Sequence, residues 1–248
     1  MSETTPARPR ALITGASSGI GASFARQLAA KGYDLVLVAR RRDRLEGLAD
    51  EVHGAKASSE VLTADLVNQH GLDQVRDRIG RGDLELLINN AGFPGYRPFV
   101  ELDPDVADDL VRLHVRVPTL LSRAALPHMV RRRSGGIVNV ASLLSLSGSI
   151  PPNPMPYRAV YAGAKAYLLT FTQTLAGELK DSGVRLQVLL PGVVDTEFHD
   201  RLNMDRGRLK TMAMKPDEVV GASLAAFESG ELICAPGLDD PTLIEELG

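Results

Sequence analysis

The sequence predicts one α/β domain, a doubly wound and mostly parallel sheet with helices on both faces. Short apolar runs alternate along the chain with longer segments of helical periodicity, and that order produces right-handed crossovers between parallel strands. The apolar runs are continuous, which is typical of strands covered on both faces. At 248 residues an α/β chain commonly forms a single domain.

The elements follow from this pattern in chain order. The first strand, RALIT, leads into an amphipathic helix, and the second strand, DLVLVA, leads into a charged one. Later apolar runs repeat the strand signal, and the longest helical stretch precedes the sixth of them. We expect strands at Arg10–Thr14, Asp34–Ala39, Ser59–Ala64, Leu84–Asn89, Gly136–Ser142, Val184–Leu190 and Leu232–Cys234, and helices at Ile20–Lys31, Arg42–Val52, Asp105–Arg133 and Val160–Asp181.

Two segments depart from the alternation. Residues 145–156 form a proline-rich loop, and residues 197–214 are polar with interspersed leucine and methionine. Each is either a lid over a substrate site or an ordinary surface connection. The first nine residues are mostly polar and are expected to be flexible.

Composition excludes several classes of protein. Cys234 is the only cysteine, so neither an internal disulfide nor a thiolate metal cluster is expected, and we predict no metal site. The net charge of −3 and the 4% aromatic content give no basis for nucleic-acid binding. No apolar run approaches the ~18 residues that cross a bilayer, and the polar N-terminus does not resemble a secretory signal. The expected location is the cytoplasm, away from the membrane.

The first strand leads into a glycine-rich turn, TGASSGIG at positions 14–21. Glycine permits positive φ and a close approach of backbone to ligand, and the following helix offers free N–H groups that favour a phosphate. A tight turn without a ligand is the alternative. The same turn matches the G-x-S-x-G elbow of serine hydrolases, but no earlier strand exists to supply their oxyanion loop. Ser17 as a nucleophile is therefore a remote alternative.

The second strand ends just before Arg40, Arg41 and Arg42. In NAD sites an acidic side chain near this point accepts from the ribose 2′-hydroxyl, whereas a guanidinium holds a 2′-phosphate through charge-assisted hydrogen bonds. Cations are disfavoured at a helix N-terminus, so a solvated helix start explains these arginines less well than a ligand does. The sequence therefore favours NADP(H) over NAD(H).

Tyr161 and Lys165 are four residues apart in a helical segment, so they share one face. A nearby ammonium favours an ionised phenol, and we expect it to lower the pKa of Tyr161 from about 10. Such a tyrosine can exchange a proton with a substrate oxygen. The spacing becomes specific only in combination with the other motifs.

The glycine-rich turn, the NNAG segment at 89–92, the Tyr161–Lys165 pair and the Pro191–Gly192 dipeptide follow one another along the chain. Together they resemble the short-chain dehydrogenase/reductase family over about residues 10–237. The resemblance implies a Rossmann-like fold and nicotinamide binding, and it leaves the substrate open. It implies cofactor contacts from Gly15, Ser17, Ser18, Gly19, Ile20, Gly21, Asp65, Leu66, Asn90, Gly92, Tyr161, Lys165, Pro191, Gly192, Val194 and Thr196, beside Arg40 and Arg41.

Some of these residues have an alternative role. Asp65 either meets the adenine or caps the next helix. Asn89, which precedes the implied cofactor residue Asn90, is interpreted as a tie between strands.

The family's substrate-orienting serine matches Ser142, with Ser145 and Ser147 as alternatives. Ser142 lies 19 residues before Tyr161, about half a dozen more than the family usually shows. The surplus falls in residues 145–156, which we interpret as an insertion at the mouth of the site.

A second departure is His114, which stands where the family usually has an asparagine that supports a proton-conducting water beside the lysine. An imidazole can both donate and accept hydrogen bonds. His114 therefore either holds that water itself, or leaves the relay impaired, or is a structural residue.

These observations predict an NADP(H)-dependent oxidoreductase that acts on a small carbonyl or alcohol substrate. Its catalytic residues would be Ser142, Tyr161, Lys165 and His114. The alternative is an NADP-binding sensor or scaffold that has lost catalysis. The resemblance implies a homodimer or homotetramer packed through the helices near residues 105–133 and 160–181.

Overall fold

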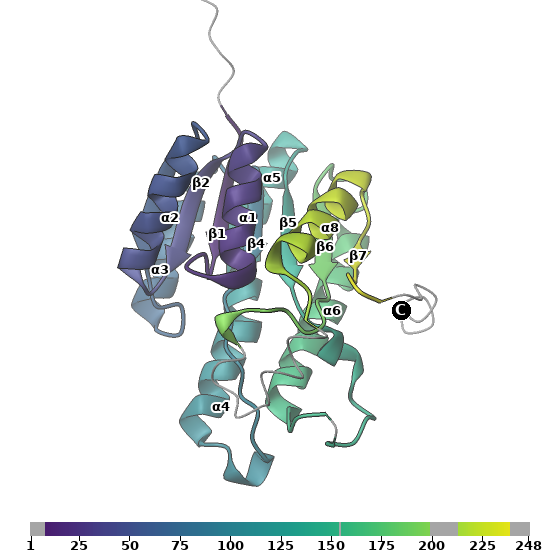
Figure 1. Cartoon of the computed structure of the whole chain (residues 1–248). Coiled ribbons are helices and arrows are strands. Elements are labelled where there is room, and N and C mark those ends of the chain that lie inside the picture. The colour runs from purple at the N-terminus through teal and green to yellow at the C-terminus, as the bar shows by residue number, and fades with distance from the viewer. Residues whose placement is uncertain (1–7, 154, 199–212, 239–248) are drawn as a thin grey trace, which may run out of the picture.

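A parallel sheet lies at the centre of the computed structural model, which describes residues 8–153, 155–198 and 213–238 (Figure 1). Within these residues every strand pair is parallel. Its strands are β1 (Arg10–Thr14), β2 (Asp34–Ala39), β3 (Ser59–Thr63), β4 (Leu86–Asn89), β5 (Gly136–Val140), β6 (Arg185–Leu189) and β7 (Ile233–Cys234). Their order across the sheet is β3-β2-β1-β4-β5-β6-β7. The strand order therefore reverses between β1 and β4, the place where α/β sheets bind ligands.

All the predicted strands are confirmed, with ends that differ by at most two residues. The expected fifth strand ends earlier because Ser142 begins a 3₁₀ turn at Leu143–Leu146, where its hydroxyl accepts from the backbone N–H of Leu144. Ser142 thus lies in the loop just beyond the sheet and not within a strand.

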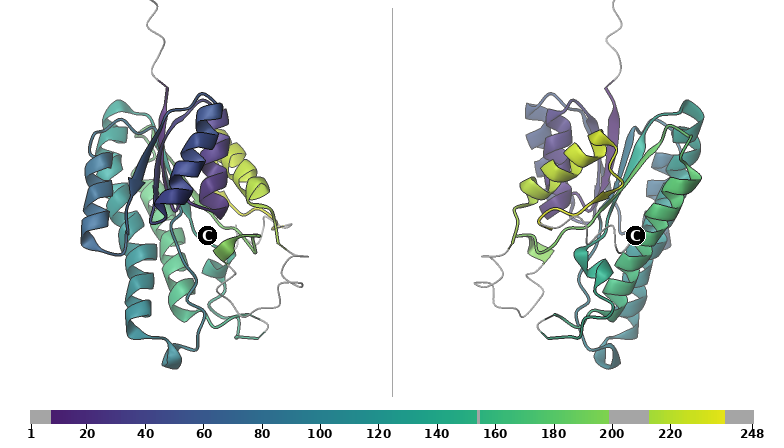
Figure 2. Two further views of the ribbon diagram at one scale, coloured as in Figure 1. Left: turned by 60° about the vertical axis from the view of Figure 1, so that its left-hand side comes forward. Right: turned by 90° about the vertical axis from the view of Figure 1, so that its right-hand side faces the viewer.

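Helices cover both faces of the sheet, as predicted (Figure 2). One face carries α1 (Gly19–Ala30), α2 (Arg42–Gly54) and α8 (Pro216–Ser229), and the other carries α3 (Gln69–Ile79), α5 (Val117–Arg132) and α6 (Ala159–Glu178). Successive side chains of a strand point to opposite faces. In β1, Ala11 and Ile13 accordingly pack with the α1 side and Leu12 packs with the α3 side.

The helical stretch expected at 105–133 is interrupted. It consists of α4 (Pro104–Val111), a π-helical turn at Arg112–Arg116 and then α5. A single π-helical turn inside a helix often marks a functional site, and this one contains His114. Figure 1 shows α4 below the sheet, beyond the carboxyl ends of the strands.

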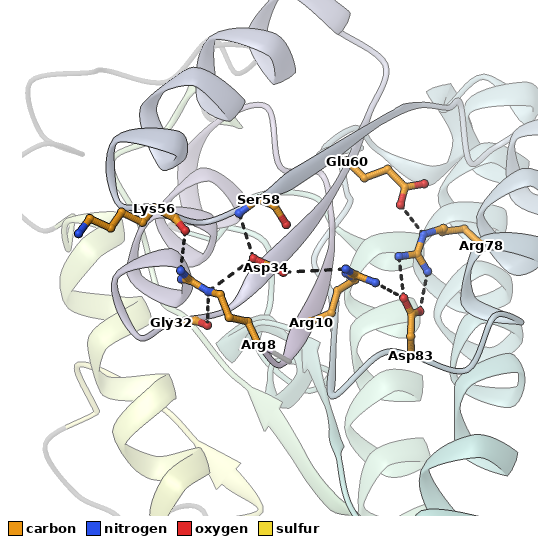
Figure 3. Close-up of polar contacts among 9 residues, drawn as sticks. All are labelled: Arg8, Arg10, Gly32, Asp34, Lys56, Ser58, Glu60, Arg78 and Asp83. Carbon is orange, nitrogen blue, oxygen red and sulfur yellow. Dashed lines mark hydrogen bonds and ion pairs between the residues drawn. The ribbon is translucent and has the colours of Figure 1, made fainter. Parts of the chain in front are cut away.

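A network of charged side chains lies at the amino ends of the strands, opposite the carboxyl ends (Figure 3). Arg78 is buried and donates to Glu60 and Asp83, each at 2.7 Å. Arg10 also pairs with Asp83, and it lies 3.9 Å from a carboxylate oxygen of Asp34. The network therefore ties the starts of β1, β2 and β3 to the end of α3.

The N-terminal segment 1–9, which is expected to be flexible, is described only from Arg8 onward. Residues 1–7 lie outside the described part, but Arg8 donates to the carbonyl oxygens of Gly32 and Lys56, and the Pro9 carbonyl accepts from Asp34. Residues 8 and 9 are thus held against the sheet edge. Among the described helices, none is long and apolar enough to cross a membrane.

Candidate active site

The glycine-rich turn closes against the residues that follow β4. Gly15 and Gly19 have φ values of 69° and 55°, as predicted for left-handed backbone. The Asn90 side chain donates to the carbonyl oxygens of Thr14 and Gly15, at 2.9 and 3.3 Å. A Cβ at Gly21 would lie 2.3 Å from the Gly15 carbonyl oxygen. The turn therefore requires glycine at position 21 for its own packing.

The N-terminus of α1 fits a phosphate. Its N-cap residue, Ser18, makes no side-chain capping bond, and the first turn contains no acidic residue. The backbone N–H groups at a helix start attract anions through their partial positive charge. This turn therefore offers a dinucleotide pyrophosphate free backbone N–H groups and no opposing acidic side chain.

Arg41 lies over the same turn and fits a second phosphate. Its guanidinium donates to Ser17 Oγ and Ser18 Oγ, at 3.0 and 2.8 Å, and to the Glu197 carboxylate at 2.7 Å. Arg40 is exposed and, within the described residues, its side chain has no hydrogen-bond or ion-pair partner. Of the two arginines singled out from the sequence, only Arg41 contacts the turn. A guanidinium beside two hydroxyls suits the 2′-phosphate that distinguishes NADP from NAD.

Tyr161 occupies the centre of the site and is 5% exposed. Its phenol is in contact with the hydroxyls of Ser142 and Tyr96. Burial raises the pKa of Tyr161 well above its ordinary value, the neighbouring Tyr96 raises it further, and the hydrogen bond from Ser142 lowers it only in part. The prediction of a lowered pKa is therefore wrong, because burial is the largest influence on the pKa of this phenol.

Lys165 lies beneath the Tyr161 ring on α6. Its Nζ atom is 5.6 Å from the ring centroid and donates to the Val140 carbonyl at 2.7 Å. Burial lowers the pKa of Lys165 to about 7, since a desolvated ammonium is unfavourable. This amine can consequently change its charge near neutral pH.

His114 is buried against Tyr161, with the two ring centroids 5.3 Å apart in an edge contact. Its Nε2 atom lies 3.0 Å from the Phe93 carbonyl oxygen and 3.3 Å from the Phe93 backbone nitrogen. An Nε2-protonated imidazole donates to the carbonyl, whereas an Nδ1-protonated one accepts from the N–H. Burial, reinforced by Lys165, lowers the pKa of His114 well below 6.5. A Cβ at Gly92 would lie 2.5 Å from the imidazole Cε1, so glycine there makes room for this ring.

Unpartnered polar atoms surround a small cavity behind the site. Asn89 Oδ1 and His114 Nδ1 are buried and have no hydrogen-bond partner within the described part of the chain. Both residues line a cavity of about 10 Å³ together with Lys165. That volume holds roughly one water molecule. A water molecule there would hydrogen-bond to these two atoms, whose burial without a hydrogen bond is energetically unfavourable.

The two alternative serines, Ser145 and Ser147, differ in their contacts. Ser147 accepts from the buried Arg158, which also donates to the carbonyl oxygens of Ser147, Ile150 and Pro156. Ser145 has a buried hydroxyl without a partner. Ser142 is thus the serine that contacts Tyr161, and Arg158 holds the base of the 145–156 loop.

The other predicted residues lie around these groups. Asp65 does not cap the next helix, because Asn68 is the N-cap of α3 and accepts from Gly71, while Asp65 accepts from Val67. Leu66 is buried.

Asn89 ties β4 to β5 through a 2.8 Å hydrogen bond to Asn139, as interpreted from the sequence.

The segment after β6 also lies beside the turn. The Pro191 carbonyl accepts from the Leu143 N–H, which holds this segment next to Ser142. Gly192 is exposed, and Val194 is buried and bridges to Met214. A Cβ at Gly19 would lie 2.9 Å from the Thr196 side chain. Ile20 packs partly buried against the core. Most of the lid expected at 197–214, residues 199–212, lies outside the described residues.

Three site residues were missed from the sequence. Tyr96 and Phe93 follow the NNAG segment, and that position beyond β4 was the available signal. Glu197 had no signal, because its partner Arg41 is 156 residues away. No group of three His, Cys, Asp or Glu side chains within the described ranges could hold a metal ion.

Comparisons with known proteins agree with this geometry. A family model described as short chain dehydrogenase matches residues 9–207. The uncharacterized oxidoreductase YmfI of Bacillus subtilis is 35% identical over 190 residues, which cover 76% of each chain. A short chain dehydrogenase of Pseudocercospora fijiensis is 30% identical over 239 residues, covering 91% of this chain and 75% of the relative.

Solved structures give the same result. The short-chain dehydrogenase from Sphingobium yanoikuyae in complex with NADPH has a TM-score of 0.89 at 35% identity, covering 96% of this chain and 92% of that one. The bulky-bulky ketone specific alcohol dehydrogenase from Comamonas testosteroni has a TM-score of 0.85 at 33% identity, covering 96% and 90%. The family model and these relatives extend over most of the chain, which therefore belongs to the short-chain dehydrogenase/reductase family of oxidoreductases.

Proposed function

We propose that the protein is an NADP(H)-dependent oxidoreductase that interconverts a carbonyl compound and its alcohol. The observation that carries the proposal is the contact between Tyr161 and Ser142, with Lys165 directly beneath the tyrosine ring. Arg41 on the glycine-rich turn supports NADP(H) as the cofactor. The structures of similar proteins with NADPH or NADP support the same choice.

The proposed chemistry assigns one task to each side chain. The nicotinamide, when bound, donates or accepts the hydride. Ser142 Oγ hydrogen-bonds to the substrate oxygen and orients it, and Tyr161 Oη gives that oxygen a proton during reduction or takes one during oxidation. The raised pKa of Tyr161 keeps the phenol protonated at neutral pH, which suits reduction.

Lys165 and His114 would restore the proton at Tyr161. The water-sized cavity touches His114 and Lys165, and the His114 Nδ1 atom has no hydrogen-bond partner among the described residues. In the tautomer whose Nε2 donates to the Phe93 carbonyl, Nδ1 can accept from a water molecule, and in the tautomer whose Nε2 accepts from the Phe93 N–H, Nδ1 can donate to it. We propose that this water links Lys165 to His114, with the imidazole in the place of the family's asparagine.

A homodimer or homotetramer is part of the proposal. Val106 and Val111 of α4 and Tyr167 of α6 are exposed apolar side chains on the helices through which the resemblance implies packing. Their burial between subunits would remove apolar surface from water.

The deciding experiment combines binding with turnover. Wild-type protein is titrated with NADPH by calorimetry, and NADPH oxidation is then followed by absorbance over a panel of aldehydes and ketones. The panel should include bulky ketones, because a similar structure is that of a bulky-bulky ketone specific enzyme. Turnover that disappears in Tyr161→Phe supports the proposal. Tight binding without turnover on any substrate would favour the sensor or scaffold, and labelling of Ser17 by a fluorophosphonate would favour the hydrolase.

A further inference from the structure

The acidic side chain of Glu197 lies on the basic cradle at the glycine-rich turn. One carboxylate oxygen accepts from Arg41 at 2.7 Å, and the other is 3.6 Å from a guanidinium nitrogen of Arg44. The Ser18 hydroxyl lies beside the same carboxylate and, after Arg41 and Arg44, helps to lower its pKa. Glu197 therefore makes the contacts that an anionic ligand of this cradle would make.

The hydrogen-bonding pattern is that of a phosphate site. Arg41 reaches Glu197 with one terminal nitrogen and the hydroxyls of Ser17 and Ser18 with the other. Two guanidiniums and a hydroxyl around one set of oxygens match the donors that proteins use to hold a phosphate monoester. The two anions cannot occupy the same donors at the same time.

We infer that Glu197 is a built-in competitor for the 2′-phosphate subsite, which NADP(H) must displace from Arg41 in order to bind. This inference rests on the proposed function, since it takes NADP(H) to be the cofactor. NAD(H) carries a neutral hydroxyl at this position and does not need the guanidinium. Glu197 thus reduces the preference of the site for NADP(H) over NAD(H).

Exchange between the two anions is physically reasonable. The pair is exposed, with 43% of the Arg41 side chain and 45% of the Glu197 side chain accessible, and ion pairs of that kind are weak. A phosphate monoester carries about −1.5 to −2 charges near neutral pH, so it is the stronger ligand for two guanidiniums. Glu197 lowers the affinity for this phosphate without blocking the subsite.

The test is equilibrium binding to the Glu197→Gln variant. Calorimetric titration should show NADPH and adenosine 2′-monophosphate binding about two- to five-fold more tightly than to the wild type, in line with the loss of a weak exposed ion pair. The affinity for NADH should change less than about two-fold. The NADPH gain should shrink as salt rises from about 0.02 M to about 0.5 M, because exposed charges are screened.

Two matched variants isolate the contact. Glu51→Gln removes the same charge from α2, where Glu51 pairs with Arg26 and not with the cradle, and it should leave the affinity for NADPH unchanged. In an Arg41→Met background the Glu197→Gln substitution should give a smaller gain, since Arg41 is the shared partner.

The outcomes separate the inference from the proposed function. An NADPH affinity in Glu197→Gln that is equal to or weaker than that of the wild type overturns the inference, and a weaker one would show that Glu197 orders Arg41 for the cofactor. Wild-type protein that binds neither NADPH nor NADH would overturn the proposed function and the inference with it.

Discussion

The Nζ atom of Lys165 lies 5.6 Å from the centroid of the Tyr161 ring, below its face. Its short hydrogen bond goes to the Val140 carbonyl, so the ammonium is fixed by the end of β5. Because both groups are buried, each is shifted toward its neutral form: the pKa of Tyr161 rises and the pKa of Lys165 falls to about 7. At neutral pH the site therefore holds a protonated phenol above an amine that is close to its titration point.

Replacement of Tyr161 by phenylalanine should abolish proton transfer while leaving the cofactor bound. We expect kcat to fall by about 10²–10⁴, the usual contribution of a general acid or base. The Kd for NADPH, measured by calorimetry, should stay within about three-fold of the wild-type value.

Ser142→Ala should lower kcat more than its control, Ser145→Ala, because, of these two serines, Ser142 is the one that contacts Tyr161. Equal losses in the two serine variants would contradict the assignment.

The rate of reduction should depend on pH through Lys165. The amine is charged below its pKa of about 7 and neutral above it, and the charged form assists proton transfer to Tyr161. We therefore expect kcat/KM for NADPH-dependent reduction to be highest below about pH 7 and to fall as pH rises beyond it. In Lys165→Met this transition should be missing from whatever activity remains, and a wild-type profile that rises across the same range would be inconsistent with the role.

The unfolding free energy should depend on pH through the same amine of Lys165. Lys165 has a lower pKa in the folded state, about 7, than its ordinary 10.5, so the unfolded chain binds more protons between these values. Wild-type stability relative to Lys165→Met should therefore increase by up to about 1.4 kcal/mol per pH unit from pH 7 toward 10. Urea unfolding at several pH values measures this difference, and a constant difference would contradict burial of the amine.

His114 should act by positioning a water molecule. His114→Leu removes the Nδ1 atom that would bond to the water and should lower kcat by about ten-fold or more, whereas His114→Asn keeps a polar side chain and should retain more activity. The pH of the transition assigned to Lys165 should move in His114→Leu and return toward the wild-type value in His114→Asn. Identical pH profiles in all three proteins would leave His114 a packing residue.

Arg41 should determine the affinity for the 2′-phosphate. Arg41→Met removes charge-assisted hydrogen bonds worth about 1.5–3 kcal/mol, so we expect NADPH binding to weaken roughly 10- to 100-fold with little change for NADH. Arg40→Met is the matched control, since Arg40 is exposed and has no described side-chain partner. Equal effects of the two substitutions would show that the contact seen at Arg41 does not select the cofactor.

The charged network around Arg78 and Asp83, at the amino ends of the strands, should stabilise the fold in a pH-dependent way. Burial raises the pKa of Asp83, but hydrogen bonds from Arg78 and Arg10 outweigh it and the net pKa is below 3.8. Asp83→Asn should lower the unfolding free energy by about 1–3 kcal/mol, because Arg78 is only 3% exposed and loses a charged partner. This stabilisation is present above about pH 4 and is lost as pH falls through the folded-state pKa. Asp73 pairs with Arg76 at an exposed position, and Asp73→Asn is the control, which should change the unfolding free energy much less than Asp83→Asn does.

Local sequence patterns were sufficient to predict the fold. Continuous apolar runs and glycine spacing identified every strand of the described sheet, because a strand's burial and a turn's φ angles depend on neighbouring residues. The order of the motifs also identified the family. The break at Arg112–Arg116 was not predicted, since a π-helical turn has nearly the same apolar periodicity as the helices on either side of it.

The sequence by itself determined the architecture, the family and the side chains that gather at the carboxyl edge of the sheet. Only the tertiary structure decided that Arg41 and not Arg40 contacts the turn, that Glu197 pairs with Arg41, and that Tyr96 contacts Tyr161. It also reversed the expected shift of the tyrosine pKa. The reason is common to all of these: contacts between residues far apart in the chain, and the loss of water around them, depend on how the elements pack together, which spacing along the sequence does not encode.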